Sequence, residues 1–335
     1  MSSSEDKARE TFDKSCSGDI ILAMEKLYKF EGLMAPVFTP FSADGQLNTK
    51  IIPAYGKYLT DSGIHGVLVN GTTGEGMSMS VEERQKVTEI WKDVSKSTGL
   101  NVMVQVGGAP FPDVVKLAAH ADRCQVDSIL CLPDLYNKPK NVAEVLEYLQ
   151  QVSNAAPNTP LLYYHIPAFT NVNISITDLL SEAHNSGNFP RLAGAKFTHI
   201  NLEDGASSVR VGGKENSLGP FSLFLGSDEA LLGAFALGFN SAIGTTFNII
   251  PEFGKSILSA AKKNDFTGGQ KAQWELTKAI RTMTKQGGWV PAMKAVMNFL
   301  TPIDVGPVRF PLKPLSKDKV FAMKEDLLQL GIMKK

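Results

Sequence analysis

The sequence is poor in cysteine, in charge of one sign and in long apolar runs. Its 335 residues include three cysteines, Cys16, Cys124 and Cys131, which are too few and too scattered for a disulfide framework or a zinc knuckle. A reducing compartment is therefore expected. Basic and acidic residues number 34 each, so the formal net charge of zero indicates neither a nucleic-acid partner nor an anionic membrane surface.

Targeting and cofactor signals are lacking as well. No segment is apolar over the length of a membrane span, and the polar N-terminus has no apolar core of a signal peptide. His, Cys, Asp and Glu do not cluster at metal-ligand spacing, and no GxGxxG motif follows the first predicted strand. The sequence therefore predicts a soluble, cytoplasmic protein with no membrane partner, no metal and no nucleotide cofactor.

What is present is a regular alternation of short apolar segments with helix-like segments. The apolar runs are continuous rather than alternating, which is typical of parallel strands that are buried on both faces. Eight such strand–helix units in succession predict an α/β fold, the (β/α)₈ TIM barrel, with the active-site groups at the C-terminal ends of the strands. The predicted strands are residues 32–41, 66–71, 101–107, 127–133, 160–167, 192–198, 221–228 and 241–248.

The pattern divides the chain into three parts. Residues 1–28 form a polar leader, residues 29–265 form the barrel, and residues 266–335 form a helical C-terminal extension that packs on the barrel. The extension is predicted to hold helices at 268–286, 291–300 and 317–330, with a proline-rich link at 302–314.

A lysine lies within the sixth predicted strand, in LAGAKFT (192–198). A buried lysine is costly unless it is paired or reactive, and burial lowers the pKa of an amine toward that of a nucleophile. Strand alternation places Leu192, Gly194, Lys196 and Thr198 on one face, and Gly194 is predicted to leave room for the lysine stem. The alternative is that Lys196 lies at the strand end and its amine reaches solvent. We favour a buried, reactive lysine.

The fifth predicted strand carries two tyrosines in YYHIPA, Tyr163 and Tyr164. Alternation allows only one of them to face the barrel interior, where it would lie beside an inward lysine on strand six and could transfer protons. Packing of both tyrosines is the alternative. His165 alternates away from Tyr164, so we expect it to be structural.

Three further strand ends carry polar groups. GTTGEG (71–76) is either a simple turn or a cradle for an anion such as a carboxylate, and spacing alone does not separate the two. GSDE (226–229) offers Asp228 and Glu229, which could bind hydroxyls of a polyol or cap the next helix, and capping is the commoner use of an acid there. GTTFN (244–248) offers Thr245 and Thr246 as hydrogen-bond donors.

Taken together and in this order, GTTGEG, YYHIPA, GAKFT, GSDE and GTTFN resemble the dihydrodipicolinate synthase / N-acetylneuraminate lyase family of class I aldolases. The resemblance extends from about residue 32 to residue 330, and within the family it is strongest to the N-acetylneuraminate (sialic acid) lyases. It implies a TIM barrel, a homotetramer, a Schiff base in place of a cofactor, and reversible cleavage of N-acetylneuraminate to pyruvate and N-acetylmannosamine.

The resemblance also implies roles for individual residues. Lys196 would form the Schiff base and Tyr164 would transfer the proton. Thr72 and Thr73 would hold the carboxylate of pyruvate. The sugar side of the pocket would be lined by Thr198, Gly226, Asp228, Glu229 and Thr245.

Three positions depart from the family pattern. Phe169 stands where dihydrodipicolinate synthases carry an arginine, so that activity is not expected here. Lyases often have serine at the position of Thr245 and glycine at that of Asn171, although asparagine tolerates the left-handed conformation. The alternatives are a lyase for another 2-keto acid, such as 4-hydroxy-2-oxoglutarate or a keto-deoxy sugar acid, or a catalytically silent barrel that binds such ligands.

Overall fold

The computed structural model describes residues 28–214 and 217–333. The predicted leader therefore lies, up to residue 27, outside the described residues. None of the described helices is long and apolar enough to cross a membrane.

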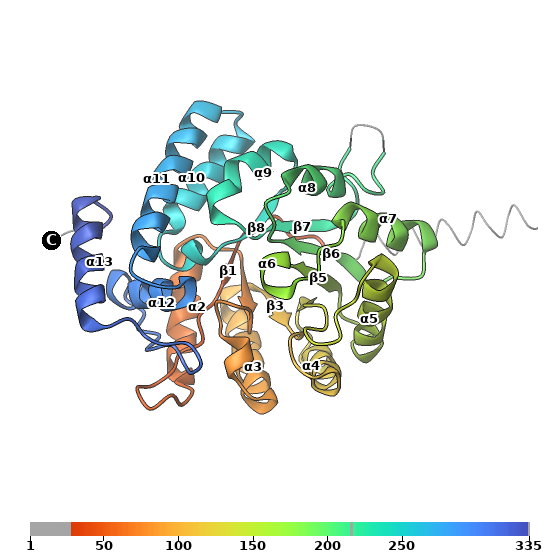
Figure 1. Cartoon of the computed structure of the whole chain (residues 1–335), viewed down its shortest axis with the longest axis horizontal. Coiled ribbons are helices and arrows are strands. Elements are labelled where there is room, and N and C mark those ends of the chain that lie inside the picture. Colours follow the sequence, from red (N-terminus) through yellow and green to blue (C-terminus); the bar gives the residue numbers. More distant parts are fainter. Residues whose placement is uncertain (1–27, 215–216, 334–335) are drawn as a thin grey trace, which may run out of the picture.

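Eight parallel strands close into a barrel in chain order, which confirms the predicted TIM barrel (Figure 1). Each strand is short and buried over most of its length, because helices cover its outer face and side chains fill the interior. The strands are β1 (Gly32–Pro36), β2 (Gly66–Val69), β3 (Asn101–Gln105), β4 (Ser128–Cys131), β5 (Leu161–His165), β6 (Leu192–Phe197), β7 (Ser222–Leu225) and β8 (Ser241–Ile243).

Amphipathic helices surround the barrel and follow the predicted positions. Helix α3 starts with the capping box that Ser80 and Glu83 form, in which each side chain bonds the backbone of the other residue. The helices of the barrel are α2 (Ile52–Asp61), α3 (Val81–Thr98), α4 (Phe111–Arg123), α5 (Val142–Ala155), α6 (Pro167–Thr170), α7 (Ile176–Ser186), α8 (Leu202–Ser208), α9 (Leu231–Leu237) and α10 (Pro251–Lys262).

The first and last strands are shorter than the apolar sequence predicts. β1 stops at Pro36 rather than residue 41, and β8 stops at Ile243 before a 3-10 turn over Thr245–Asn248. The Asn248 side chain donates hydrogen bonds to the carbonyls of Pro36 and Thr245 and so holds both departing segments. The residues beyond the strands stay buried at the barrel end, which explains why the apolar pattern continues after the strand has ended.

The barrel interior is apolar at its N-terminal end. Tyr28 and Phe30 pack against Phe224, with ring centroids 6.4 and 5.3 Å away, and close this end. The buried interior cluster also contains Met34, Leu68, Met103, Leu130, Leu162, Ala193 and Ile243. The hydroxyls of Ser222 and Ser241 at this end donate to the carbonyls of Tyr28 and Phe30, so they are already satisfied. The buried titratable groups Lys196 and Asp228 lie at the opposite end, where the strands have their carboxyl termini.

The predicted alternation along β6 is wrong at its first residue. Leu192 packs in the outer core and Ala193 in the interior, because the register with β5 shifts between Leu161 and Leu162. At Gly194 φ is +150°, and a Cβ there would lie 1.9 Å from the backbone oxygen of Ser222. This glycine therefore permits the close approach of β7 rather than making room for the lysine stem.

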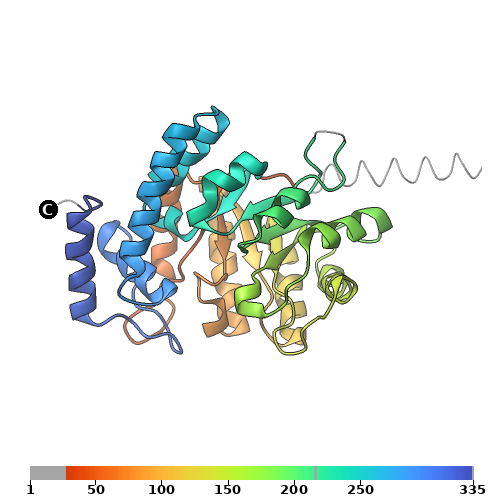
Figure 2. The same ribbon diagram turned by 45° about the horizontal axis from the view of Figure 1, so that its top comes forward.

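The C-terminal extension packs on one side of the barrel, where its helices appear in blue in Figures 1 and 2. It consists of α11 (Phe266–Thr284), α12 (Trp289–Leu300) and α13 (Lys317–Gln329), close to the predicted bounds. Helix α11 packs against α10, and α12 contacts the turn that follows β8. The extension thereby reaches the end of the barrel at which the strands terminate.

Candidate active site at the C-terminal end of the barrel

The polar strand ends meet around one cavity of about 230 Å³. All nine predicted site residues line it, together with apolar side chains and Trp289. The nine are Thr72, Thr73, Tyr164, Lys196, Thr198, Gly226, Asp228, Glu229 and Thr245. The sequence motifs are thus brought together from five different strand ends.

Lys196 and Tyr164 lie at the buried side of this cavity. They are directly paired in the register of β5 and β6, and both side chains are nearly fully buried, with 5% and 2% of their surface exposed. Lys196 Nζ donates a hydrogen bond to the Tyr164 hydroxyl over 3.1 Å. Tyr163 packs in the outer core, so Tyr164 is the inward tyrosine that alternation requires.

The space beside the lysine comes from Gly226 at the end of β7. A Cβ at this position would lie 1.9 Å from Thr198 Oγ1 and 3.2 Å from Lys196 Cε. Any larger residue would therefore displace the lysine stem or the threonine. Within the described part of the chain, Thr198 Oγ1 is buried without a hydrogen-bond partner, which leaves it available to a ligand.

The loop after β2 presents two hydroxyls to the cavity. Thr72 Oγ1 lies 3.3 Å from the Tyr164 hydroxyl, and Thr73 Oγ1 lies 2.9 Å from Thr245 Oγ1. The backbone N–H groups of Thr72 and Thr73 donate no hydrogen bond to any residue that the structure describes. Two hydroxyls and two N–H groups without a backbone acceptor are the kind of donors that an anion cradle at the GTTGEG motif would need.

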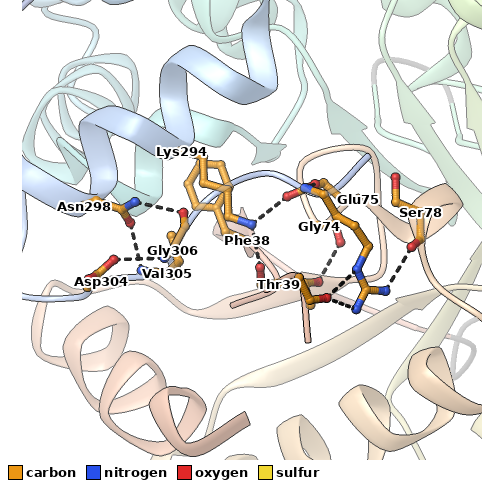
Figure 3. Close-up of polar contacts among 12 residues, drawn as sticks. Phe38, Thr39, Gly74, Glu75, Ser78, Lys294, Asn298, Asp304, Val305 and Gly306 are labelled. Atoms are coloured by element: carbon orange, nitrogen blue, oxygen red, sulfur yellow. Dashed lines mark hydrogen bonds and ion pairs between the residues drawn. The ribbon is translucent and has the colours of Figure 1, made fainter. Parts of the chain in front are cut away.

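A buried ion pair attaches the loop after β2 to helix α12 (Figure 3). Lys294 of α12 donates hydrogen bonds to Glu75 Oε1 over 2.7 Å and to the carbonyl of Thr39 over 2.8 Å. The two charged side chains are 1% and 0% exposed. Burial lowers the pKa of Lys294, and the charge of Glu75 opposes this shift. Glu75 itself has a left-handed backbone, with φ of 55°, so its side chain anchors a strained turn.

Arg309 completes the attachment of the extension. Its backbone N–H donates to Glu75 Oε2 over 2.7 Å, so both carboxylate oxygens of Glu75 are bonded. Its guanidinium pairs with Glu83, whose pKa it lowers, and also donates to the Ser78 carbonyl. Glu75, Lys294 and Arg309 were not predicted as site residues, because nothing in the sequence spacing shows that they meet.

The two acids after β7 have different surroundings. Asp228 is buried and accepts hydrogen bonds from the Thr246 hydroxyl and N–H, while burial raises its pKa. Glu229 is exposed, and its Oε1 lies 3.6 Å from Nε of Arg281 in α11. Neither acid caps α9, since its N-cap is Ala230 and no side chain caps it. The capping alternative is therefore wrong.

Three other residues noted in the sequence lie around the cavity or behind it. His165 is buried on the outer side of β5, against Tyr163 and Phe197, and burial lowers its pKa to about 4. Asn171 ends α6 with φ of 56°, the left-handed conformation expected for it. Phe169 lines the cavity and is 70% exposed.

Trp289, at the first position of α12, is a cavity residue that the sequence analysis missed. Its indole N–H donates to Thr245 Oγ1 over 3.2 Å. It also lines a second, mainly apolar cavity of about 440 Å³, which shares Thr72, Ile166 and Phe169 with the first. The only signal in the sequence was a tryptophan after two glycines, which carries no information about what it contacts.

The described residues contain no group of three or more His, Cys, Asp or Glu side chains placed to hold a metal ion. The site instead consists of one amine, a phenol, several hydroxyls and two carboxylates. An amine beside a phenol at the buried side of a cavity can attack a carbonyl group and then exchange protons with the product.

Comparisons with known proteins agree with this chemistry. The model of the dihydrodipicolinate synthetase family matches residues 29–330. N-acetylneuraminate lyase from Gallus gallus is 34% identical over 300 residues, which cover 89% of this chain and 96% of that protein. The relative of the same name from Sus scrofa is 32% identical over 306 residues, with coverages of 91% and 94%.

Solved structures give the same result. N-acetylneuraminate lyase from Proteus mirabilis superposes with a TM-score of 0.84 at 30% identity, covering 91% of this chain and all of that one. The family match over residues 29–330 includes the strand ends that carry the cavity residues and the C-terminal helices. On this evidence the chain belongs to the dihydrodipicolinate synthetase family of TIM-barrel proteins.

Proposed function

We propose that the protein is a class I aldolase that reversibly cleaves N-acetylneuraminate to pyruvate and N-acetylmannosamine. The observation that carries the proposal is the contiguous set Lys196 Nζ, Tyr164 OH and Thr72 Oγ1, with successive distances of 3.1 and 3.3 Å. We assign these groups as the amine nucleophile, the proton-transfer group and a carboxylate-binding hydroxyl, and their spacing is short enough for one ligand to contact all three. The relatives named N-acetylneuraminate lyase support the choice of substrate.

The first half of the reaction forms an imine. The Lys196 amine attacks the keto carbon C2 of the open-chain sugar acid, and loss of water leaves a protonated imine on Nζ. This cation withdraws electrons more strongly than the ketone that it replaces. Thr72 and Thr73 hold the neighbouring carboxylate through their hydroxyls and N–H groups and so orient C2 toward the amine.

The second half breaks the carbon–carbon bond. Tyr164 accepts the proton of the C4 hydroxyl while its own proton passes through Thr72 toward the substrate carboxylate. The C3–C4 bond breaks, its electron pair moves into the enamine, and N-acetylmannosamine leaves as the aldehyde. The proton held at the carboxylate returns through Thr72 and Tyr164 to C3 of the enamine. Water then hydrolyses the imine, which releases pyruvate and restores Lys196.

The sugar end is assigned to Thr198, Gly226, Asp228, Glu229 and Thr245. Thr198 Oγ1 lacks a partner among the described residues, and Glu229 is accessible from the cavity, so both can bond a polyol. If Glu229 binds only the sugar, Glu229→Ala lowers the cleavage rate about tenfold and leaves pyruvate trapping unchanged, since one lost hydrogen bond to a charged group is worth about that much. Equal losses in both assays would make Glu229 structural.

Trapping with borohydride tests the chemistry, and product analysis tests the substrate. Pyruvate plus borohydride should leave a reduced adduct on Lys196, detected by peptide mass, and Lys196→Ala should abolish it. No adduct, or an adduct that persists in the variant, would overturn the aldolase proposal. Trapping without pyruvate release from N-acetylneuraminate would retain the chemistry and shift the substrate to another 2-keto acid.

We further propose that the barrel (29–265) and the extension (266–335) form one catalytic unit and that the protein assembles as a homotetramer. The first part is supported by Trp289 and Lys294, which reach the barrel end from α12. The second is supported by apolar side chains at the same end, where Tyr136 is 93% exposed and Leu135 38%. Light scattering should give four times the chain mass of 36.3 kDa, and a monomer would contradict the assembly.

The cytoplasm is the proposed location. Cys124 and Cys131 are both free thiols, as expected of a protein that works in a reducing compartment. Fractionation of the source cells, with the enzymatic activity as the readout, tests this assignment.

A further inference from the structure

A chain of three side chains crosses the top of the barrel. Trp289 Nε1 donates to Thr245 Oγ1 over 3.2 Å, and Thr245 Oγ1 lies 2.9 Å from Thr73 Oγ1. The members come from three separate segments, namely the start of α12, the turn after β8 and the loop after β2. Thr73 and Thr245 are each 5% exposed, so little water competes with these hydrogen bonds.

The chemistry of the two ends determines the direction of this chain. An indole N–H can only donate a hydrogen bond, and an ionised carboxylate can only accept one. When a carboxylate binds at Thr73, the Thr73 hydroxyl must point its hydrogen at the ligand. Thr245 then donates its hydrogen to Thr73 Oγ1 and accepts the indole N–H, so each hydrogen in the chain has one acceptor.

Without the indole N–H this order is no longer enforced. While the indole N–H donates to Thr245 Oγ1, Thr73 Oγ1 is the only described partner that can accept the Thr245 hydrogen. Once the indole is replaced, a water molecule can accept that hydrogen instead, and Thr73 can turn its own hydrogen toward Thr245 and away from the ligand. In the intact chain each bond polarises the next, which strengthens the hydrogen bond that finally reaches the carboxylate.

We propose that Trp289 is a positioning residue for the substrate carboxylate, acting through Thr245 to fix Thr73 as a hydrogen-bond donor. The inference rests on the proposed function and deepens it, since the ligand is the carboxylate of a 2-keto acid. It also moves Thr245 from the sugar side, where the family resemblance placed it, to the carboxylate side of the cavity.

The test measures the pyruvate concentration that gives half-maximal borohydride trapping on Lys196. Trp289→Phe keeps an aromatic ring and removes the N–H, and Thr245→Val removes the hydroxyl. Each should raise the half-saturating concentration roughly threefold to tenfold, as expected for one hydrogen bond, with little change in the trapping rate at saturation. The double variant should be no weaker than Thr245→Val alone, because both changes interrupt the same chain.

Matched controls separate this effect from a loss of packing. Trp274→Phe, which changes an exposed tryptophan of α11, should behave like wild type. Thr245→Ser keeps the hydroxyl and should recover most of the affinity for pyruvate that Thr245→Val loses. Acetone is a ketone without a carboxylate, so its trapping at high concentration should be the same in wild type and Trp289→Phe.

The opposite results would overturn the inference. These are an unchanged half-saturating concentration in Trp289→Phe, an equal shift for acetone and pyruvate, or additive losses in the double variant. If wild-type protein forms no adduct with pyruvate, the proposed function itself is overturned, and the inference with it.

Discussion

Among the described residues two lysines are buried, and their surroundings differ. Lys196 lies in the barrel interior, lines the cavity and contacts a neutral tyrosine hydroxyl. Lys294 lies between α12 and the loop after β2, lines neither of the two cavities at this end, and pairs with a buried carboxylate. Lys196 forms no ion pair with any residue that the structure describes.

The difference shows that burial alone does not make a lysine a nucleophile. A buried amine that shares a carboxylate keeps its proton and stabilises the fold, because breaking such a pair leaves an uncompensated charge. A buried amine without a carboxylate partner, open to a ligand cavity, is free to react with a carbonyl group. We therefore expect the pairing and the access of each lysine, rather than its burial, to decide which of the two roles it has.

The largest expected effect comes from Lys196→Met. We expect the cleavage rate to fall by at least about 1,000-fold, because the covalent intermediate cannot form. The free energy of unfolding should stay the same or rise, since an apolar chain of similar size replaces a buried amine. Steady-state pyruvate release and chemical denaturation measure the two effects. A destabilised but active variant would contradict the distinction between the lysines.

Lys294→Met should have the opposite profile. We expect the free energy of unfolding to fall by about 3–5 kcal/mol, because Glu75 is left buried and unpaired. Denaturant titration measures it. The double variant Lys294→Met with Glu75→Gln removes both charges and should regain part of the loss. If the double variant is less stable than the single one, the pair is not the source of the effect.

Tyr164→Phe tests the neutral partner of Lys196. Loss of the proton-transfer group should lower the cleavage rate by roughly 100-fold while pyruvate is still trapped on Lys196. Pyruvate release and borohydride trapping, measured side by side, separate the two steps. A variant that cleaves at the wild-type rate would exclude Tyr164 from proton transfer.

His165 is a buried base of a third type, and its effect on the pH dependence of stability is the smallest that we expect. It has no hydrogen-bond partner among the described residues, and burial lowers its pKa from 6.5 to about 4. Between these two values the unfolded chain binds a proton that the folded one does not. Stability should therefore fall by up to about 1.4 kcal/mol per pH unit as the pH decreases through this window. Denaturation at several pH values gives the free energy of unfolding as a function of pH. His165→Phe should lose this part of the pH dependence, and parallel plots for wild type and variant would contradict the shifted pKa of His165.

The barrel and its polar strand ends could be predicted from the sequence because each depends on local pattern. Continuous apolar runs identify parallel strands, and alternation allows only one of Tyr163 and Tyr164 to face the interior, while the family resemblance points to Tyr164. The same reasoning failed at the register shift near Gly194 and at the ends of β1 and β8. There the neighbouring strand or the Asn248 side chain, both distant in sequence, decides where the backbone goes.

By itself, the sequence determined the barrel, the inward lysine and tyrosine, and the set of polar residues that meet at the strand ends. Only the tertiary structure decided what surrounds them. Glu75 and Lys294 are 219 residues apart, and Trp289 bonds a threonine 44 residues before it. No periodicity relates such positions, because their contacts arise from the packing of the C-terminal helices on the barrel. The two buried lysines have different surroundings for this same reason.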